Sequence, residues 1–348
     1  MTDSPALDRP RRWLLLCLLP LAAGAAAEPR YVDRDEVRQF VAEMHQRHGF
    51  EPAPLLHLFA RVKPQAAAIK AIMPPKDPGV RSWHAYRSRY VEPRRIEWGL
   101  GFWQEHRAAL EAAQREYGVP EEIIVAIIGV ETIYGRHMGR FPVLDTLTTL
   151  AFDYPPRAEL FRRELEAFLL LARETGADPR QARGSYAGAM GLPQFLPSSI
   201  RRYAVDFDGD KRIDLRASPD DAIGSVARFL KEHGWEKDGI VAVPANIADE
   251  RHGTVVDGDV RPRFSLPELS AYGVYPAEPL PIDALCAVID LVTPNRPTEY
   301  WLGLNNFYVI TRYNRSSFYA MAVYELAREL RAVRQTHELA GNNAGAER

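Results

Sequence analysis

The stretch from Val119 to Gly135, which reads VPEEIIVAIIGVETIYG, decides the fold of this 348-residue chain. Pro120 and the two glutamates after it favour a helix start, because proline suits the first turn and carboxylates stabilise the positive end of the helix dipole. From Ile123 to Val130 every face of this helix is apolar, which predicts a helix buried on all sides. We therefore expect a mainly helical protein built around this segment.

Glu131 is the carboxylate that ends this apolar run, just before Gly135 can stop the helix. Apolar surroundings disfavour its charged form, and the negative end of the helix dipole acts in the same direction, so its pKa should rise. An acid with a pKa near neutrality can donate a proton to a glycosidic oxygen and then act as a base. The residues alone leave a second interpretation open, in which Glu131 merely emerges on the solvated face of the helix end.

A second informative segment, Gly184–Ser199, reads GSYAGAMGLPQFLPSS. Its small residues let the chain pass close to a ligand, and Ser185 and Gln194 offer hydrogen bonds. The rings of Tyr186 and Phe195 offer apolar faces, and sugars present both hydroxyl edges and C–H faces. Taken in isolation, the segment is equally compatible with a structural glycine-rich turn.

Apolar residues at helical spacing predict several further helices. One of them begins with Ser218-Pro219-Asp220-Asp221, which is typical of a capping box with proline at the first position. Between about residues 238 and 300 the pattern changes to short β-prone runs broken by proline and glycine, such as Ile240–Pro244 and Thr254–Val256. The predicted fold class is mainly α (α+β) with a small β-rich insertion. The predicted helices cover Asp33–Gly49, Ala158–Glu174, Ser218–Gly234 and Ser317–Val333.

The charge balance excludes two classes of protein. With 44 lysines and arginines against 46 acidic residues, the chain is neither a nucleic-acid binder that works through bulk basic charge nor a self-repelling acidic chain. The two cysteines, Cys17 and Cys286, are too distant to build a disulfide framework or a cysteine zinc site.

The N-terminus has the features of a secretory signal. Three arginines, the last of them Arg12, precede the uncharged stretch Trp13–Ala27, which is shorter than the roughly 20 residues that span a bilayer. We expect cleavage after residue 27 and export to the periplasm, by a route that the residues leave open, while an uncleaved anchor remains the alternative. Cys17 lies within the apolar stretch and not in a lipobox. Residues 28–340 then form the mature region, with no membrane span, and residues 341–348 a flexible tail.

Several motifs resemble the membrane-bound lytic transglycosylase B family, in a fixed order over nearly the whole mature chain. They are Gly129–Thr132 with Gly135-Arg136, Tyr186–Ser199, Tyr203–Asp206, Asp220–Val226 and Ile310–Asn314. The resemblance implies a lysozyme-like core at about residues 100–236 and 300–335, with added helices and a small β-rich part at about 238–300. It also implies an exported enzyme that cuts the β-1,4 bond between N-acetylmuramic acid and N-acetylglucosamine and leaves a 1,6-anhydromuramic acid end. Peptidoglycan strands are the implied partner, with cell-wall synthesis or division proteins as further partners, and catalysis needs no cofactor.

By this resemblance Glu131 is the single catalytic acid and base. Other residues match positions that bind the glycan in the family: Ser185, Gln194, Tyr313, Asn314, Tyr86, Arg157 and Tyr319. The chain departs from the family pattern at Pro156, Leu160 and Leu192-Pro193, which bears on subsite preference rather than on the chemistry. Two rival functions remain: a lysozyme-like hydrolase, and a non-catalytic peptidoglycan-binding scaffold, which the presence of Glu131 disfavours.

The segment Asp206–Asp214 places carboxylates at positions one, three, five and nine of an EF-hand loop. Lys211 stands where the loop prefers glycine, and Ala217 stands where it prefers glutamate. The predicted ligands of a structural Ca²⁺ are the carboxylates of Asp206, Asp208, Asp210 and Asp220 and the carbonyl of Arg212. The alternative is a solvated acidic turn in which Asp220 serves only the helix dipole.

Overall fold

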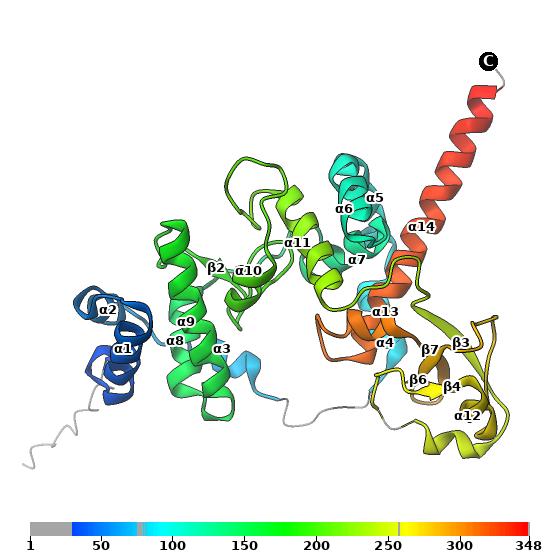
Figure 1. The fold of residues 1–348 in the computed structure, drawn as a ribbon, viewed down its shortest axis with the longest axis horizontal. Helices are drawn as coiled ribbons and strands as arrows, with labels where there is room; N and C mark the ends of the chain where they lie inside the picture. The colour runs from blue at the N-terminus through cyan, green and yellow to red at the C-terminus, as the bar shows by residue number, and fades with distance from the viewer. Residues whose placement is uncertain (1–29, 75–78, 80, 257, 347–348) are drawn as a thin grey trace, which may run out of the picture. The chain divides into compact units, whose positions relative to one another are not determined.

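The computed structural model describes residues 30–74, 79, 81–256 and 258–346, and the side chains as far as residue 337. The predicted signal peptide at residues 1–27 lies outside the described residues. The chain divides into two compact units, one up to Ala60 and one from Arg61 onward. Figure 1 traces the helices and strands of both units along the chain.

The first unit contains a short 3₁₀ helix, η1 (Tyr31–Asp33), and two α-helices, α1 (Asp35–His48) and α2 (Pro52–Phe59). Helix α1 ends where the sequence predicts, because Gly49 adopts a left-handed conformation with φ of 66°. The predicted apolar stripe of α1 is confirmed, since its side chains are buried: Val37, Phe40, Val41 and Met44.

The second unit is mainly helical, which confirms the predicted fold class. Two short 3₁₀ helices, η2 (Pro155–Arg157) and η3 (Glu250–Thr254), supplement its α-helices. The α-helices are α3 (Ala66–Ile72), α4 (Trp83–Tyr90), α5 (Pro93–Glu105), α6 (Arg107–Tyr117), α7 (Glu121–Thr132), α8 (Val143–Asp153), α9 (Ala158–Thr175), α10 (Pro197–Tyr203), α11 (Pro219–Glu232), α12 (Leu266–Ala271), α13 (Asn305–Ile310) and α14 (Ser317–Ala346).

Helix α7 is the buried central helix that the sequence predicts. Every residue from Glu121 to Val130 is buried, and the helix contacts α5, α6, α11 and α14 (Figure 1). Burial of so many isoleucine and valine side chains contributes about 1.5–3 kcal/mol each, which makes α7 the main anchor of this unit.

The β-rich part forms one antiparallel sheet with the strand order β4-β6-β7-β3-β5. Its register pairs Val243 with Leu302 and Val288 with Leu302 on either side of β7, and these residues share a small core with the buried Cys286. The segment Thr254–Val256, predicted as β-prone, is not a strand, because Thr254 is the last residue of η3 and Val255 caps this helix. The strands are β3 (Ala242–Ile247), β4 (Phe264–Ser265), β5 (Val274–Pro276), β6 (Leu285–Leu291) and β7 (Glu299–Gly303), and β1 (Phe141–Pro142) pairs separately with β2 (Arg183–Gly184).

Helix α14 continues well beyond Val333 and ends at Ala346, inside the segment predicted as a flexible tail. The alanines and the glutamate in this stretch favour helix, and the two asparagines and two glycines are too few to stop it. Within the described residues, no helix combines the length and the apolar character needed to cross a bilayer.

Candidate active site

Glu131 occupies the last turn of α7, where its side chain is partly exposed while the residues before it are buried. The hydroxyl of Tyr319 donates a hydrogen bond of 2.6 Å to Oε1 of Glu131. Removal of water from the carboxyl group raises its pKa to about 7, and the hydrogen bond from Tyr319 opposes part of this rise. The raised pKa agrees with the prediction from the sequence.

Three tyrosines surround this carboxylate. Burial raises the pKa values of Tyr86, Tyr313 and Tyr319, and the negative charge of Glu131 raises all three further. The rings of Tyr313 and Tyr319 stack with their centroids 6.5 Å apart, and Tyr86 packs against Phe318 with centroids 5.7 Å apart. The structure therefore brings three of the predicted substrate-binding residues to Glu131.

Helix α7 ends at Thr132, earlier than the glycine at 135 suggests, because Ile133 and Tyr134 adopt left-handed conformations with φ of 52° and 56°. This conformation is unfavourable for a β-branched residue, and such strain persists only where the surroundings enforce it. Here the strain is enforced by the packing of the Tyr134 ring, whose hydroxyl end lies in a slot between Gly99 and Gly129. A Cβ atom on Gly99 or Gly129 would lie 2.4 or 2.5 Å from the Tyr134 hydroxyl, so both positions require glycine.

The glycine-rich segment predicted to bind sugar is attached directly to the end of α7. The Thr132 hydroxyl donates to the Leu192 carbonyl over 3.0 Å, and the Tyr313 hydroxyl donates to the Pro193 carbonyl over 2.7 Å. Gln194 has a left-handed backbone with φ of 50°, and its side-chain amide donates to the Gly191 carbonyl over 2.9 Å. These bonds fix the loop relative to the helix that carries Glu131.

Ser185 lies at the other end of the same loop, next to the short β1–β2 pair. Its hydroxyl oxygen accepts hydrogen bonds from the backbone N–H groups of Ala187 and Ala189, over 3.2 and 3.1 Å. The Ser185 hydroxyl oxygen therefore shapes the turn by accepting these two backbone N–H groups.

Two predicted substrate-binding residues form no hydrogen bond with Glu131 in the described part of the chain. Arg157, in η2, is exposed and lies over the ring of Phe161, with 5.6 Å between the guanidinium carbon and the ring centroid. Asn314 is exposed, and its carbonyl accepts a hydrogen bond of 2.7 Å from the N–H of Ser316. Neither residue has a contact with Glu131 among the described residues.

The aspartate loop collects three of the predicted metal ligands. Carboxylate oxygens of Asp206, Asp208 and Asp210 lie within 4.8 Å of one another on the surface. Asp206 accepts hydrogen bonds of 2.8 Å from the N–H groups of Gly209 and Lys211, which curl the loop around it. Lys211 adopts a left-handed conformation with φ of 71°, so the sharp turn forms at the expected position without glycine.

Asp220, the fourth predicted carboxylate ligand, has its partner outside the aspartate cluster. The Asp220 carboxylate lies 3.6 Å from Nδ1 of His106 and is absent from the aspartate cluster. Asp221 faces the loop instead: it is buried, and its two carboxylate oxygens accept 2.7 Å hydrogen bonds from the N–H groups of Phe207 and Asp214. One residue along a helix is a rotation of about 100°, which directs the neighbouring carboxylates to different sides.

The same geometry changes the predicted capping box of α11. The Ser218 hydroxyl caps the helix by accepting from the N–H of Asp221, over 3.2 Å. The Asp221 carboxylate does not accept a hydrogen bond from the Ser218 N–H in exchange, because both of its oxygens accept from the N–H groups of Phe207 and Asp214. The reciprocal half of the capping box is therefore absent.

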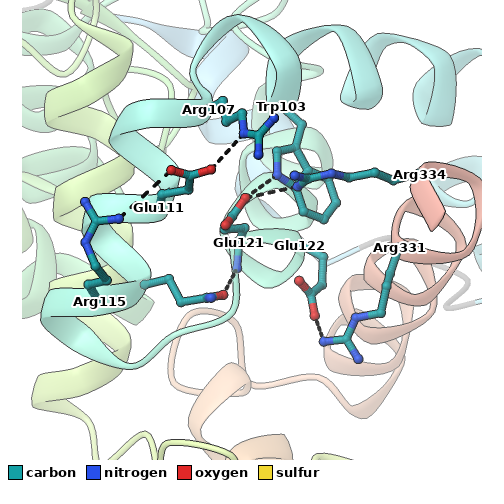
Figure 2. Close-up of polar contacts among 9 residues, drawn as sticks. Trp103, Arg107, Glu111, Arg115, Glu121, Glu122, Arg331 and Arg334 are labelled. Carbon is teal, nitrogen blue, oxygen red and sulfur yellow. Dashed lines mark hydrogen bonds and ion pairs between the residues drawn. The ribbon is translucent and has the colours of Figure 1, made fainter. Parts of the chain in front are cut away.

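A set of contacts at the start of α7 is missing from the sequence prediction, which treats Glu121 and Glu122 only as partners of the helix dipole. Figure 2 shows Glu121 between α5 and α14: its Oε2 accepts hydrogen bonds of 2.5 Å from Nε1 of Trp103 and 3.1 Å from Nη1 of Arg334. Glu122 forms an ion pair with Arg331, one turn earlier on α14. The sequence did contain one sign of these contacts: Arg331 and Arg334 are three positions apart, so they lie on one face of a helix.

Together these contacts fasten α14 along the whole of α7. The middle of α14, at Arg331 and Arg334, holds the first turn of α7 through Glu121 and Glu122, while the first turn of α14 holds Glu131 through Tyr319. The two helices are therefore antiparallel neighbours, and α14 sets the direction of the carboxylate.

Comparison with known proteins identifies the family. The model of the transglycosylase SLT domain matches residues 33–328. Among curated proteins, the chain is similar to the membrane-bound lytic murein transglycosylase B of Escherichia coli K12, with 41% identity over 313 residues that cover 87% of this chain and 85% of that protein.

Solved structures of lytic transglycosylases share the fold. Soluble SltB1 from Pseudomonas aeruginosa has a TM-score of 0.81 and 49% identity over 86% of this chain and 99% of that chain. Escherichia coli Slt35 in complex with calcium has a TM-score of 0.76 and 42% identity, over 85% and 93% of the two chains. SltB3 from Pseudomonas aeruginosa, in complex with NAG-anhNAM-pentapeptide, has a TM-score of 0.74 and 30% identity, over 85% of this chain and 79% of that chain. The chain belongs to the transglycosylase SLT domain family, and it is an enzyme of the lytic transglycosylase class.

Proposed function

We propose that this protein cleaves the β-1,4 bond between N-acetylmuramic acid and N-acetylglucosamine in peptidoglycan and closes a 1,6-anhydro ring on the muramic acid, with Glu131 as the only acid and base. The observation that carries the proposal is the Glu131 carboxyl group, whose pKa is about 7 and whose Oε1 is held by Tyr319. Such a group has both protonation states accessible near neutral pH, which a residue that acts as acid and then as base requires.

The proposed reaction needs no second carboxylate. Protonated Glu131 gives its proton to the glycosidic oxygen, the bond from this oxygen to C1 breaks, and positive charge develops at C1 of the muramic acid. The Glu131 carboxylate then takes the proton of the C6 hydroxyl of the same sugar, while the C6 oxygen forms the new bond to C1. Because the nucleophile is tethered to the reacting sugar, its effective concentration is high. The hydrogen bond from Tyr319 stabilises the carboxylate between the two steps.

The remaining predicted substrate residues divide by their surroundings. The charge of Glu131 adds to the effect of burial in raising the pKa values of Tyr86 and Tyr313, so both side chains lie near this carboxylate, which supports a place for them at the reacting sugars. Gln194 lies on the loop bonded to the end of α7 and supports sugar binding through its amide. For Ser185, Asn314 and Arg157 a role in binding the glycan stays a prediction.

We further propose a structural Ca²⁺ in the aspartate loop, held by Asp206, Asp208 and Asp210 with the carbonyl of Arg212. Clustered, exposed carboxylates match the oxygen ligands that Ca²⁺ prefers. The solved structure of Slt35 in complex with calcium supports this assignment. Asp221 holds the loop backbone from beneath, and the ion would screen the mutual repulsion of the three carboxylates without taking part in the reaction.

An exported location accords with this substrate, and we propose cleavage of the predicted signal peptide followed by action in the periplasm. The relative from Escherichia coli is a murein transglycosylase, which supports a role in the cell wall. We propose the domain division expected from the sequence as well, with a lysozyme-like core at about residues 100–236 and 300–335 and the β-rich part at about 238–300.

The test is mass spectrometry of the fragments that the purified protein releases from peptidoglycan sacculi. Ring-closed muramic ends are one water lighter than the ends that a lysozyme-like hydrolase leaves, so the two reactions give different masses. The Glu131→Gln variant should fold normally and release almost nothing. Wild-type turnover by this variant, or hydrated ends from the wild type, would contradict the proposal.

A further inference from the structure

A cavity of about 710 Å³ lies between the small sheet and the segment that joins α13 to α14. The loop around Asp259, strand β6, the end of α13 and the start of α14 line it, all within the second unit. Cavities of this size accommodate small molecules or several residues of a peptide.

The charged side chains at this cavity are mainly arginines. Four arginines and two aspartates line it, which gives a net positive charge of two: Arg81, Arg261, Arg312, Arg315, Asp259 and Asp290. Asp259 already has partners, since it forms ion pairs of 3.0 Å with Arg261 and with Arg263. The excess positive charge is therefore carried by arginines other than Arg261.

Three of these arginines are available to a ligand. Arg81, Arg312 and Arg315 are exposed at the cavity, and none of them forms an ion pair within the part of the chain that the structure describes. Arg81 stacks over the ring of Phe318 at 4.6 Å, and Arg312 lies over Tyr308 at 5.7 Å. Stacking on a ring orients a guanidinium while its N–H donors stay free for a carboxylate, which arginine binds with two parallel hydrogen bonds.

The cavity adjoins the proposed catalytic centre. Residues 311–319 connect the two sites: Arg312, Arg315 and Ser317 line the cavity, while Tyr313 binds Pro193 and Tyr319 binds Glu131. The arginine lining therefore begins within a few residues of the group that donates to the catalytic carboxylate.

The chemistry of the substrate suggests what these arginines bind. The sugar rings of peptidoglycan are uncharged, whereas the short peptide stem attached to the muramic acid carries free carboxylates. An extended stem of three or four residues spans roughly 10–14 Å, far enough to run from a sugar near Glu131 into the neighbouring cavity. We propose that this arginine-lined cavity binds the peptide stem through its carboxylates, an inference that rests on the proposed function.

The test compares glycan strands that carry stems with the same strands after an amidase has removed them. The double variant Arg312→Gln/Arg315→Gln should lower kcat/KM on stem-bearing strands about five- to twentyfold and leave kcat/KM on naked strands unchanged. Replacement of both residues by lysine should restore part of the loss. The matched control is Arg163→Gln on α9, an exposed arginine that pairs with Glu159 and does not line the cavity; it should change neither rate.

Equal losses on both substrates would overturn the proposal, because the arginines would then act through the adjacent Tyr313 segment. No loss on either substrate, or a wild type without preference for stems, would overturn it as well. Calorimetric titration with the free tetrapeptide stem separates this inference from the proposed function: binding should occur in the wild type and in Glu131→Gln and disappear in the double variant. Activity on strands without tetrapeptide binding would refute only the stem site, and binding without any strand cleavage would refute only the proposed function.

Discussion

Tyr319, in the first turn of α14, donates a hydrogen bond of 2.6 Å to Glu131, in the last turn of α7, although 188 positions separate them in the chain. Two opposing influences act on the carboxyl group. Desolvation raises its pKa, and the hydrogen bond from Tyr319 lowers it by stabilising the charged form. The balance near 7 permits an acid that can also act as a base.

The pH profile should report this balance. Catalysis begins with protonated Glu131, so kcat/KM of the wild type should fall about tenfold per pH unit above about 7. In Tyr319→Phe the pKa of Glu131 should rise, which moves this limb to higher pH, and kcat should fall roughly ten- to a hundredfold because the carboxylate loses its donor. Tyr313→Phe is the control, because its hydroxyl donates to Pro193 and the limb should stay in place. An unmoved limb in Tyr319→Phe would refute the role assigned to this bond.

Gly129 should be sensitive to the smallest enlargement. A Cβ atom there would lie 2.5 Å from the Tyr134 hydroxyl, so Gly129→Ala should lower the free energy of unfolding by roughly 1–3 kcal/mol and disturb the strained turn after Glu131. Gly101→Ala, in helix α5 with no atom within 4 Å of the added Cβ, is the matched control and should stabilise the protein by about 0.5–1 kcal/mol. Urea unfolding measures both, and equal effects would contradict the slot for Tyr134.

The contact between Glu121 and α14 should be worth more than a surface ion pair. Glu121→Ala removes the acceptor of the buried Trp103 N–H and the partner of Arg334, and we expect a loss of about 1–3 kcal/mol in the free energy of unfolding. Glu111→Ala breaks the exposed pairs with Arg107 and Arg115 that Figure 2 also draws, and because solvent screens such pairs it should lower the free energy of unfolding far less. Similar losses of unfolding free energy in the two variants would show that the Glu121 contact contributes no more than an exposed ion pair.

Calcium should raise the melting temperature if the aspartate loop binds it. With calcium at about a hundred times its Kd, binding would add about 2.7 kcal/mol to the free energy of unfolding, so Tm should exceed that in excess chelator. Asp208→Ala should abolish the difference and Asp220→Ala should retain it, because Asp220 faces His106. Asp221→Ala should lower Tm even in chelator, since two backbone N–H groups lose their acceptor. A calcium effect lost in Asp220→Ala would reinstate the ligand set expected from the sequence.

The helical predictions succeeded where a periodic pattern coincides with a local stop or cap. Helices α1 and α9 end at His48 and Thr175, each directly before a glycine, and α11 starts after Ser218. The errors arose where tertiary contacts override local preference. Helix α7 stops at Thr132 because Tyr134 must enter the slot between two glycines, a contact between helices that no local pattern records.

The residues alone were enough to predict a buried helix that ends in a carboxylate, because side-chain hydrophobicity and helical periodicity are local properties. They also predicted the raised pKa of Glu131, since desolvation follows from the apolar run itself. The identity of its hydrogen-bond partner, the choice of Asp221 over Asp220 at the loop, and the ion pairs of Glu121 and Glu122 came only with the folded chain. These contacts join positions that are distant in sequence or depend on which side of a helix a residue faces, so only the packing of α7, α11 and α14 decides them.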